Sequence, residues 1–281
     1  MELLSLKAAL AFYAAATALA FVYLSSKDEA WSLWMLRLLS AGLCLHLIGF
    51  ALRLTAFWAM PENRFFLPIN SFFGALSYLS LAAAFFFFYV EREHHLGILG
   101  AFVLPPTVIG TGLAVFSADA SVSVLAPDLR SYWMNLHPML LMTAYAALGN
   151  AFGVGLALLL QEYQVKSRKP SALCYRLPSL EELDTLEYRL IAVAFPVLLI
   201  GILMGGVWAS RAWESAWGAD PKVIWSLVTA AIYGAYLSLR HFRGLRGRKA
   251  VYLSMVGFAS VVFTFVAVNF LSGLHGYLSN G

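Results

Sequence analysis

The run from Tyr188 to Ala209 reads YRLIAVAFPVLLIGILMGGVWA and contains a single charged side chain, Arg189, near its beginning. A helix needs about 20 apolar residues to cross the hydrocarbon core of a bilayer, so this run predicts a membrane-spanning helix. Seven further runs of similar character occur along the chain. The eight predicted spans lie at 4–24, 31–57, 67–90, 96–116, 137–160, 188–209, 223–239 and 251–271.

The composition of the whole chain agrees with this class of protein. Of its 281 residues, 61% are hydrophobic and 12% are charged, and the mean hydropathy is +0.75, outside the range of soluble globular proteins. The sequence therefore predicts an all-α polytopic membrane protein with one integral membrane domain over residues 1–281. The net charge of +4 does not indicate nucleic-acid binding, because the basic residues fall between the apolar runs. Cys44 and Cys174 form no CxxC motif, which argues against thiol chemistry.

Two basic connections predict the orientation of the spans. One holds Lys166, Arg168, Lys169, Arg176 and Arg189, and the other runs from 240 to 249 as RHFRGLRGRK. Lys and Arg next to membrane spans stay on the cytoplasmic side, so both connections are predicted to be cytoplasmic and both chain termini to lie outside. A signal peptide is not predicted, because Lys7 interrupts the opening of the chain.

A local signal precedes the sixth span, in the segment LPSLEELD at 177–184. Ser179 and Glu182 have the spacing of a capping box, in which each side chain satisfies a free amide at a helix beginning. This pattern predicts a short acidic helix that leads into the span.

Residues 207–225 read VWASRAWESAWGADPKVIW and hold half of the 8 tryptophans. Membrane interfaces are enriched in Trp, which accounts for one or two of them. Trp213 and Trp217, four residues apart, would share one face of a helix. The Asp220-Pro221 step is predicted to begin the next span. A concentrated aromatic segment with a fixed acid suits a large flat apolar ligand better than it suits lipid anchoring.

His137 and His275 are predicted to lie at the outer ends of spans, in the same compartment as the Trp-rich segment. Two neutral imidazoles that approach one iron from opposite faces are the usual ligands of a b-type heme. Two interfacial histidines without a ligand are the alternative interpretation. The aromatic segment between them in sequence favours the heme site.

Other polar residues in or near the spans are predicted to be structural. His46 and Arg53 lie in one span, seven residues apart on one helical face. Because an ionisable group at that depth costs roughly 2.5–3.5 kcal/mol on insertion scales, both are expected to face the interior and to have partners. His94 and His95 follow charged residues in a short turn and are expected to be solvated.

Four stretches resemble the CcsA/ResC cytochrome c assembly proteins, which handle heme in the system II route of cytochrome c maturation. They are SYWMNLHP around His137, LPSLEELD before the sixth span, the Trp-rich stretch at 208–225, and VNFLSGLHGY around His275. The resemblance covers most of the chain. It identifies the Trp-rich stretch as the family's "WWD" heme-presenting segment, and it matches the two histidines to the family's external heme ligands.

The resemblance implies a function and partners. The chain is expected to hold a non-covalent heme b at the outer face of a bacterial cytoplasmic membrane or a thylakoid membrane, where heme is attached to the CxxCH motif of an apocytochrome c. A CcsB/ResB-type membrane partner is implied. The expected heme contacts are Trp208, Trp213, Trp217, Trp225 and Asp220 around the porphyrin, with Arg211 or Lys222 at the propionates.

The chain departs from the family pattern at three places. Residues 217–223 read WGADPKV where the family has WSWDPKE, so that Ala219 and Val223 replace a Trp and a Glu. Ser238 replaces the His of a Tyr-Leu-His triplet, and 71–74 read SFFG in place of Asn-x-Tyr-Glu. The external site is therefore better supported than a heme-transit site within the membrane.

Three functions remain open at this point. The first is a component of a holocytochrome c synthase, or heme lyase, with the external heme site. The second is a family descendant without synthase activity, acting as a heme-binding subunit of a respiratory cytochrome complex or as a heme regulator. The third, a transporter for a non-heme substrate, has only the eight-span architecture in its favour.

Overall fold

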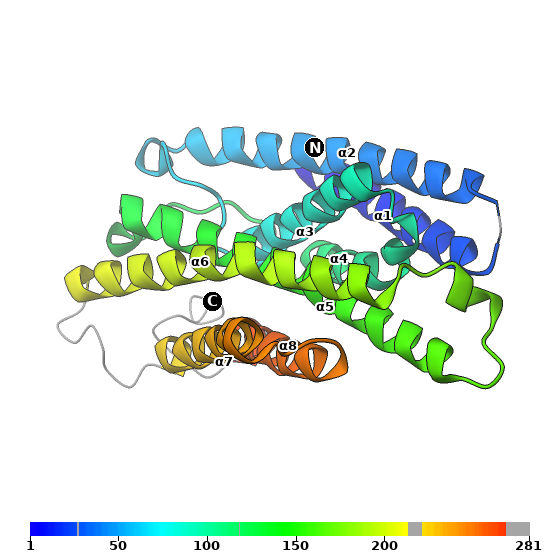
Figure 1. Ribbon diagram of the computed structural model, residues 1–281. Coiled ribbons are helices and arrows are strands. Elements are labelled where there is room, and N and C mark those ends of the chain that lie inside the picture. Colours follow the sequence, from blue (N-terminus) through cyan, green and yellow to red (C-terminus); the bar gives the residue numbers. More distant parts are fainter. Residues whose placement is uncertain (27, 118, 213–220, 268–281) are drawn as a thin grey trace.

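The computed structural model describes residues 1–26, 28–117, 119–212 and 221–267, and within these ranges all regular structure is helical (Figure 1). The long helices are α1 (Glu2–Ser25), α2 (Ala30–Trp58), α3 (Phe72–His94), α4 (Gly100–Ser117), α5 (Tyr132–Lys166), α6 (Leu180–Ala212), α7 (Pro221–Arg243) and α8 (Arg248–Val262). With the turns that adjoin α4 and α8, these are 8 helices long and apolar enough to cross a membrane. The predicted fold class, an all-α polytopic membrane protein, is confirmed.

Several helices extend beyond the predicted spans, because the polar residues that flank an apolar run continue the same helix. α5 has 35 residues and α6 has 33, both longer than the predicted 137–160 and 188–209. The Ser179 part of the capping signal is confirmed, since the Glu182 amide donates to the Ser179 hydroxyl at 3.2 Å. The predicted acidic helix is thus the first part of α6 and not a separate element.

α3 begins later than predicted, at Phe72 instead of near residue 67. The hydroxyl of Ser71 caps it by accepting a hydrogen bond from the Gly74 amide at 3.1 Å. A Cβ at Gly74 would lie 2.0 Å from the carbonyl oxygen of Pro68, so only glycine fits there. The SFFG sequence at 71–74, which departs from the family pattern, therefore forms the capped beginning of α3.

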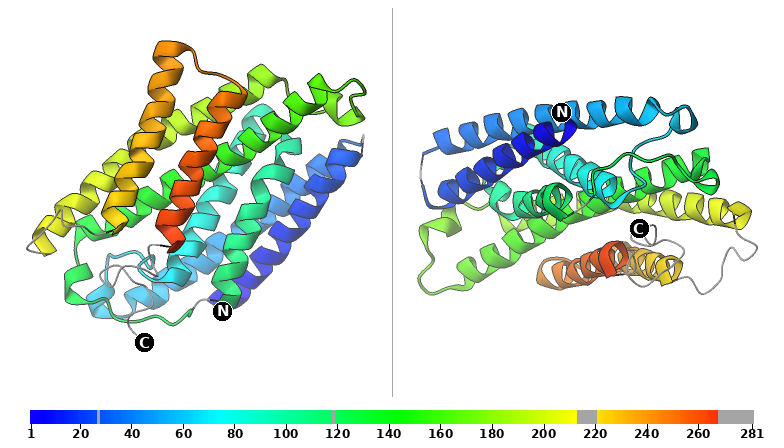
Figure 2. Two further views of the ribbon diagram at one scale, coloured as in Figure 1. Left: turned by 90° about the horizontal axis from the view of Figure 1, so that it is seen from below. Right: turned by 180° about the vertical axis from the view of Figure 1, so that it is seen from behind.

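The helices run back and forth, so that their connections gather at two ends of the bundle (Figure 2). We call one end the His137 end; it contains segments 59–71 and 119–131, the end of α6 and the beginning of α7. The opposite, basic end contains 95–99, 167–179 and 244–247. Within the bundle, α5 packs against α3, α4, α6 and α8, while α7 contacts α6 and α8.

The interior position predicted for His46 is confirmed, since its side chain is fully buried between α1 and α3. Its Nδ1 lies 3.2 Å from the Tyr13 hydroxyl, and its Nε2 lies 3.0 Å from the Ser77 hydroxyl. Both ring nitrogens are thus occupied by structural hydrogen bonds. His46 ties together the three helices near its ring.

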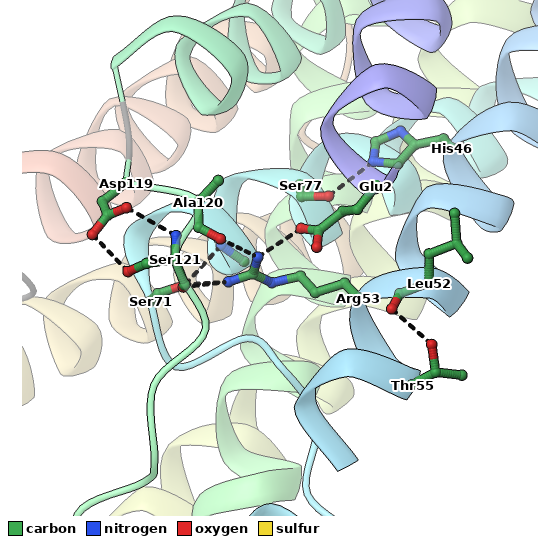
Figure 3. A network of polar contacts seen from close by, with 11 residues as sticks. Glu2, His46, Leu52, Arg53, Thr55, Ser71, Ser77, Asp119, Ala120 and Ser121 are labelled. Carbon is green, nitrogen blue, oxygen red and sulfur yellow. Dashed lines mark hydrogen bonds and ion pairs between the residues drawn. The ribbon is translucent and has the colours of Figure 1, made fainter. Parts of the chain in front are cut away.

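Arg53 is also buried, and its guanidinium joins α2 to three other parts of the chain (Figure 3). Nη1 donates to Glu2 Oε1 at 2.6 Å and to the Ala120 carbonyl at 3.0 Å. Nη2 donates to the Ser71 hydroxyl at 3.3 Å and to the Ser121 carbonyl at 3.4 Å. The network fixes the chain start, the beginning of α3 and segment 119–131 at the His137 end.

A second ion pair fastens α7 and α8 to α6 at the basic end. Asp184 accepts hydrogen bonds from both terminal nitrogens of Arg240, the longer at 3.1 Å. The amide of Gly247, which precedes α8 directly, donates to the same carboxylate at 2.7 Å. Asp184 belongs to the LPSLEELD motif, so this contact gives the motif a structural role beyond the capping box.

Candidate functional site

Segment 59–71 is fixed to the first turn of α5 by Asn135, which lies two residues before His137. Asn135 Oδ1 accepts a hydrogen bond from the Leu67 amide at 2.7 Å, and its Nδ2 donates to the Phe65 carbonyl at 3.3 Å. Phe65 has a φ of 73°, in the left-handed region that bulky residues disfavour. The bonds from Asn135 thus hold a strained turn against the helix that carries His137.

A second amide joins the two connections of this end. The buried Asn63 donates to the Ser123 carbonyl at 2.9 Å and accepts from the Leu125 amide at 2.8 Å. In the same segment, the hydroxyl and the amide of Ser121 donate to Asp119, which lowers the pKa of that carboxyl. The roles of Asn63 and Asn135 were not predicted from the sequence, although Asn135 lies inside the SYWMNLHP motif.

His137 lies in the second turn of α5, and its half-buried ring packs against α6. Its Nδ1 is 2.7 Å from the carbonyl oxygen of Gly201. A carbonyl oxygen only accepts hydrogen bonds, so Nδ1 carries the hydrogen and the neutral ring has its lone pair on Nε2. A Cβ at Gly205 would lie 2.4 Å from Cε1 and 2.6 Å from Nδ1 of His137. The ring therefore fills the space that a side chain at position 205 would need.

This arrangement is the usual one for a histidine that binds a metal. Metal-binding imidazoles nearly always donate their second ring N–H to a carbonyl or a carboxylate, which orients the ring and raises its basicity. Among the described residues, no three or more His, Cys, Asp or Glu side chains group to hold a bare metal ion. At this end, the described residues offer the imidazole of His137 with its Nδ1 held by a carbonyl oxygen.

Two predicted site residues lie near the beginning of the described part of α7, which starts at Pro221. Lys222 is half-buried, and its carbonyl accepts a hydrogen bond from the Ser226 hydroxyl at 2.7 Å. The ring of Trp225 lies 4.4 Å, between centroids, from that of Phe263 beyond α8. The ring contact places the Trp225 indole where α7 meets the end of α8.

The remaining predicted site residues are described in part or not at all. Trp208 and Arg211 belong to the last turns of α6, and the description covers only their backbone. Trp213, Trp217, Asp220 and His275 lie outside the described residues. Their roles stay predictions.

The other histidines and the transit position lie elsewhere. His94 and His95 end α3 at the basic end and are exposed, as predicted. Ser238 and His241 are exposed on α7 toward the basic end, and the His241 ring lies 4.8 Å from that of Phe242. The structure therefore does not bring His241 to the His137 end.

The fold and this end of it define a class: a polytopic helical membrane protein with an oriented histidine near one end of the bundle. Residues 69–275 match the family model of the cytochrome C assembly protein. The chain belongs to the cytochrome c assembly protein family.

Relatives of this chain carry the name cytochrome c biogenesis protein CcsA. The relative from Heterosigma akashiwo is 32% identical over 255 residues, which cover 78% of this chain and 79% of the relative. The relative from Porphyra purpurea is 30% identical over 282 residues, covering 84% of this chain and 86% of that protein. The relative from Prochlorococcus marinus is 30% identical over 233 residues, or 75% of each chain.

A solved structure, the cytochrome c heme lyase CcmF, has a similar fold. It superposes with a TM-score of 0.70 at 16% sequence identity and covers 100% of this chain. The match spans 47% of that lyase, so this chain corresponds to about half of its length. At this identity the likeness establishes the shared fold alone.

Proposed function

We propose that this chain acts in cytochrome c maturation, where it holds a non-covalent heme b at the His137 end for attachment to an apocytochrome c. The single observation that carries the proposal is the preoriented imidazole of His137, whose Nδ1 lies 2.7 Å from the Gly201 carbonyl oxygen. Family membership and the names of the relatives support the same pathway.

The residues of the His137 end have the chemistry that heme requires. His137 supplies one axial nitrogen, and His275, which follows α8 in sequence, is proposed as the opposite ligand. Lys222 and Arg211 are the cations proposed to pair with the propionates. The tryptophans at 208, 213, 217 and 225 would cover the porphyrin and exclude water, and Asp220 would order their segment.

Heme is the substrate here, and the cysteine thiols of the apocytochrome add to its vinyl groups. The chain would contribute by positioning, since holding two reactants in near-attack geometry removes much of the entropic barrier. In this role the protein is the heme-holding component of a holocytochrome c synthase. A CcsB/ResB-type membrane partner is proposed as its second component.

The charges of the two ends support an orientation. The basic end holds most of the Lys and Arg side chains, so we place it in the cytoplasm of a bacterium or on the stromal side of a thylakoid. The His137 end and both termini then face the outer compartment.

The experiment that tests this function is heme attachment in cells that depend on this chain for a reporter cytochrome c. His137→Ala and His275→Ala should each reduce covalent heme on the reporter at least about tenfold, in line with the loss of a metal contact. His94→Ala and His95→Ala, at the opposite end, should leave attachment unchanged. Equal attachment with His137→Ala and His94→Ala would contradict the proposed function.

One observation favours a second function, a heme-binding membrane subunit or heme regulator without synthase activity. Ser238 stands where the resemblance places an intramembrane heme ligand, and it is exposed on the surface of α7. In that case the purified chain would bind heme through His137, while the reporter would remain without covalent heme. The two measurements together distinguish the functions.

A further inference from the structure

Two glycines in α6, one helical turn apart, face two residues of α5 that are also one turn apart. A Cβ at Gly205 would lie 2.4 Å from the His137 ring, and a Cβ at Gly201 would lie 2.8 Å from Cδ2 of Leu141. The Gly201 site is also tight against backbone, because its Cβ would lie 3.3 Å from the Leu141 amide nitrogen. Because the two glycines and the two α5 residues have the same spacing, α6 lies close to α5 where Gly205 meets His137 and Gly201 meets Leu141.

Helix stability does not explain these glycines. A glycine inside a helix costs about 1 kcal/mol relative to alanine, and neither residue has the positive φ that would require one. By contrast, a Cβ at Gly112 of α4 would meet nothing within 4 Å. Small residues in membrane helices allow close approach of a neighbouring helix, and here the group that approaches is an imidazole.

We propose that Gly201 and Gly205 form a histidine seat: Gly205 admits the His137 ring, and the Gly201 carbonyl fixes its tautomer. This inference rests on the proposed function for its consequence toward heme. The two glycines are positioning residues, because they act on the iron only through the imidazole.

The seat has two physical effects. In the neutral ring, it selects the tautomer with the hydrogen on Nδ1, in which Nε2 carries the lone pair that a metal would bind. The hydrogen bond to Gly201 also raises the basicity of the ring, which strengthens the axial bond and favours the ferric state. Loss of the seat should therefore weaken axial ligation and raise the reduction potential of bound heme.

The first test needs no heme. In the full chain labelled with ¹⁵N-histidine, the nitrogen spectrum should include the signal of a ring held in the Nδ1–H tautomer that His137→Gln removes. Gly205→Ala should also remove it, while Gly112→Ala should retain it. An unchanged Nδ1–H signal in Gly205→Ala would overturn the seat, whatever the chain does with heme.

The second test uses hemin and imidazole as probes on the full-length protein in detergent. His137→Gly opens the ring site, and free imidazole should restore the low-spin spectrum of bound heme. Adding Gly205→Ala to this variant should raise the imidazole concentration for half recovery by about tenfold to a hundredfold, because its Cβ occupies the ring site. Adding Gly112→Ala instead should leave that concentration unchanged.

The outcomes separate the seat from the proposed function. Equal rescue of the Gly205→Ala and Gly112→Ala variants would refute the seat while heme binding stands. A wild-type chain that takes up no heme, with the Nδ1–H signal intact, would refute the proposed function and leave the seat as a structural device.

Discussion

The buried Arg53 shows how a charged side chain is accommodated inside the helix bundle. The guanidinium of Arg53 is buried, and its donors reach one carboxylate, one hydroxyl and two carbonyl oxygens. Its plane also lies over the Phe73 ring, with 4.5 Å between Cζ and the ring centroid. Removing such a residue takes the donor away from all four partners at once, so the loss exceeds the value of any single contact.

We expect Arg53→Met to destabilise the protein by roughly 3 kcal/mol, because the buried guanidinium loses its hydrogen bonds and the half-buried Glu2 carboxylate loses its counter-charge. The measurement is the thermal unfolding of the purified protein. Lys166→Met is the matched control: it breaks the Lys166–Glu162 pair, whose lysine side chain is 69% exposed, and should cost less than about 1 kcal/mol. Similar losses in the two variants would show that the Arg53 network is not a structural anchor.

The sequence predicted the burial of single polar residues correctly, but it did not predict their hydrogen-bond partners. The depth of His46 and Arg53 within an apolar run was enough to predict that both face the interior. Their partners were not predictable, because Glu2 and Ser121 lie 51 and 68 residues away along the chain. The hydrogen bond from His137 to Gly201 was missed for the same reason, since a backbone acceptor has no sequence signature.

At the scale of elements, α6 connects the two ends of the molecule. Near the basic end, Asp184 fastens the α7–α8 hairpin through Arg240 and Gly247. Near the other end, the histidine seat holds His137. The sequence predicted that this helix exists and that Ser179 caps its beginning. The sequence did not predict its contacts, because they depend on how three helices pack.

Asp184→Asn should loosen the attachment of α7 and α8 to α6. The change removes the counter-charge of Arg240 and weakens the acceptor of the Gly247 amide, and breaking a buried pair costs about 3–5 kcal/mol. Hydrogen exchange at the first turn of α8 should accelerate in this variant. Glu181→Gln, an exposed change in the first turn of α6, is the control and should leave exchange there unaltered. Equal exchange in both variants would contradict a fastening role for Asp184.

The whole molecule is a bundle with chemically different ends. Apolar run length predicted the number of spans, and the basic connections predicted which loops share an end. The arrangement of the helices around α5 was not predictable, because every span is apolar on most of its surface and periodicity then carries little information. Residues 213–220 of the Trp-rich segment and residues 268–281, which include His275, lie outside the described residues.

Orientation in the membrane can be tested with single cysteines in a Cys44→Ser, Cys174→Ser background. Tyr132→Cys and Phe242→Cys place thiols at sites that are 72% and 80% exposed, at the His137 end and the basic end respectively. A thiol reagent that does not cross membranes should label Tyr132→Cys in intact cells and Phe242→Cys only after permeabilisation, because the positive end stays inside. The reverse pattern would place the proposed heme site in the cytoplasm.

The central claim, that His137 binds heme iron at the outer end of the bundle, is tested most directly by the absorption spectrum of the purified protein. Wild-type protein and His94→Ala should carry six-coordinate low-spin heme in equal amounts, measured as pyridine hemochrome. His137→Ala should lose the low-spin spectrum and most of its heme, because one axial ligand is gone. A His137→Ala protein with wild-type heme content and an unchanged low-spin spectrum would contradict the claim.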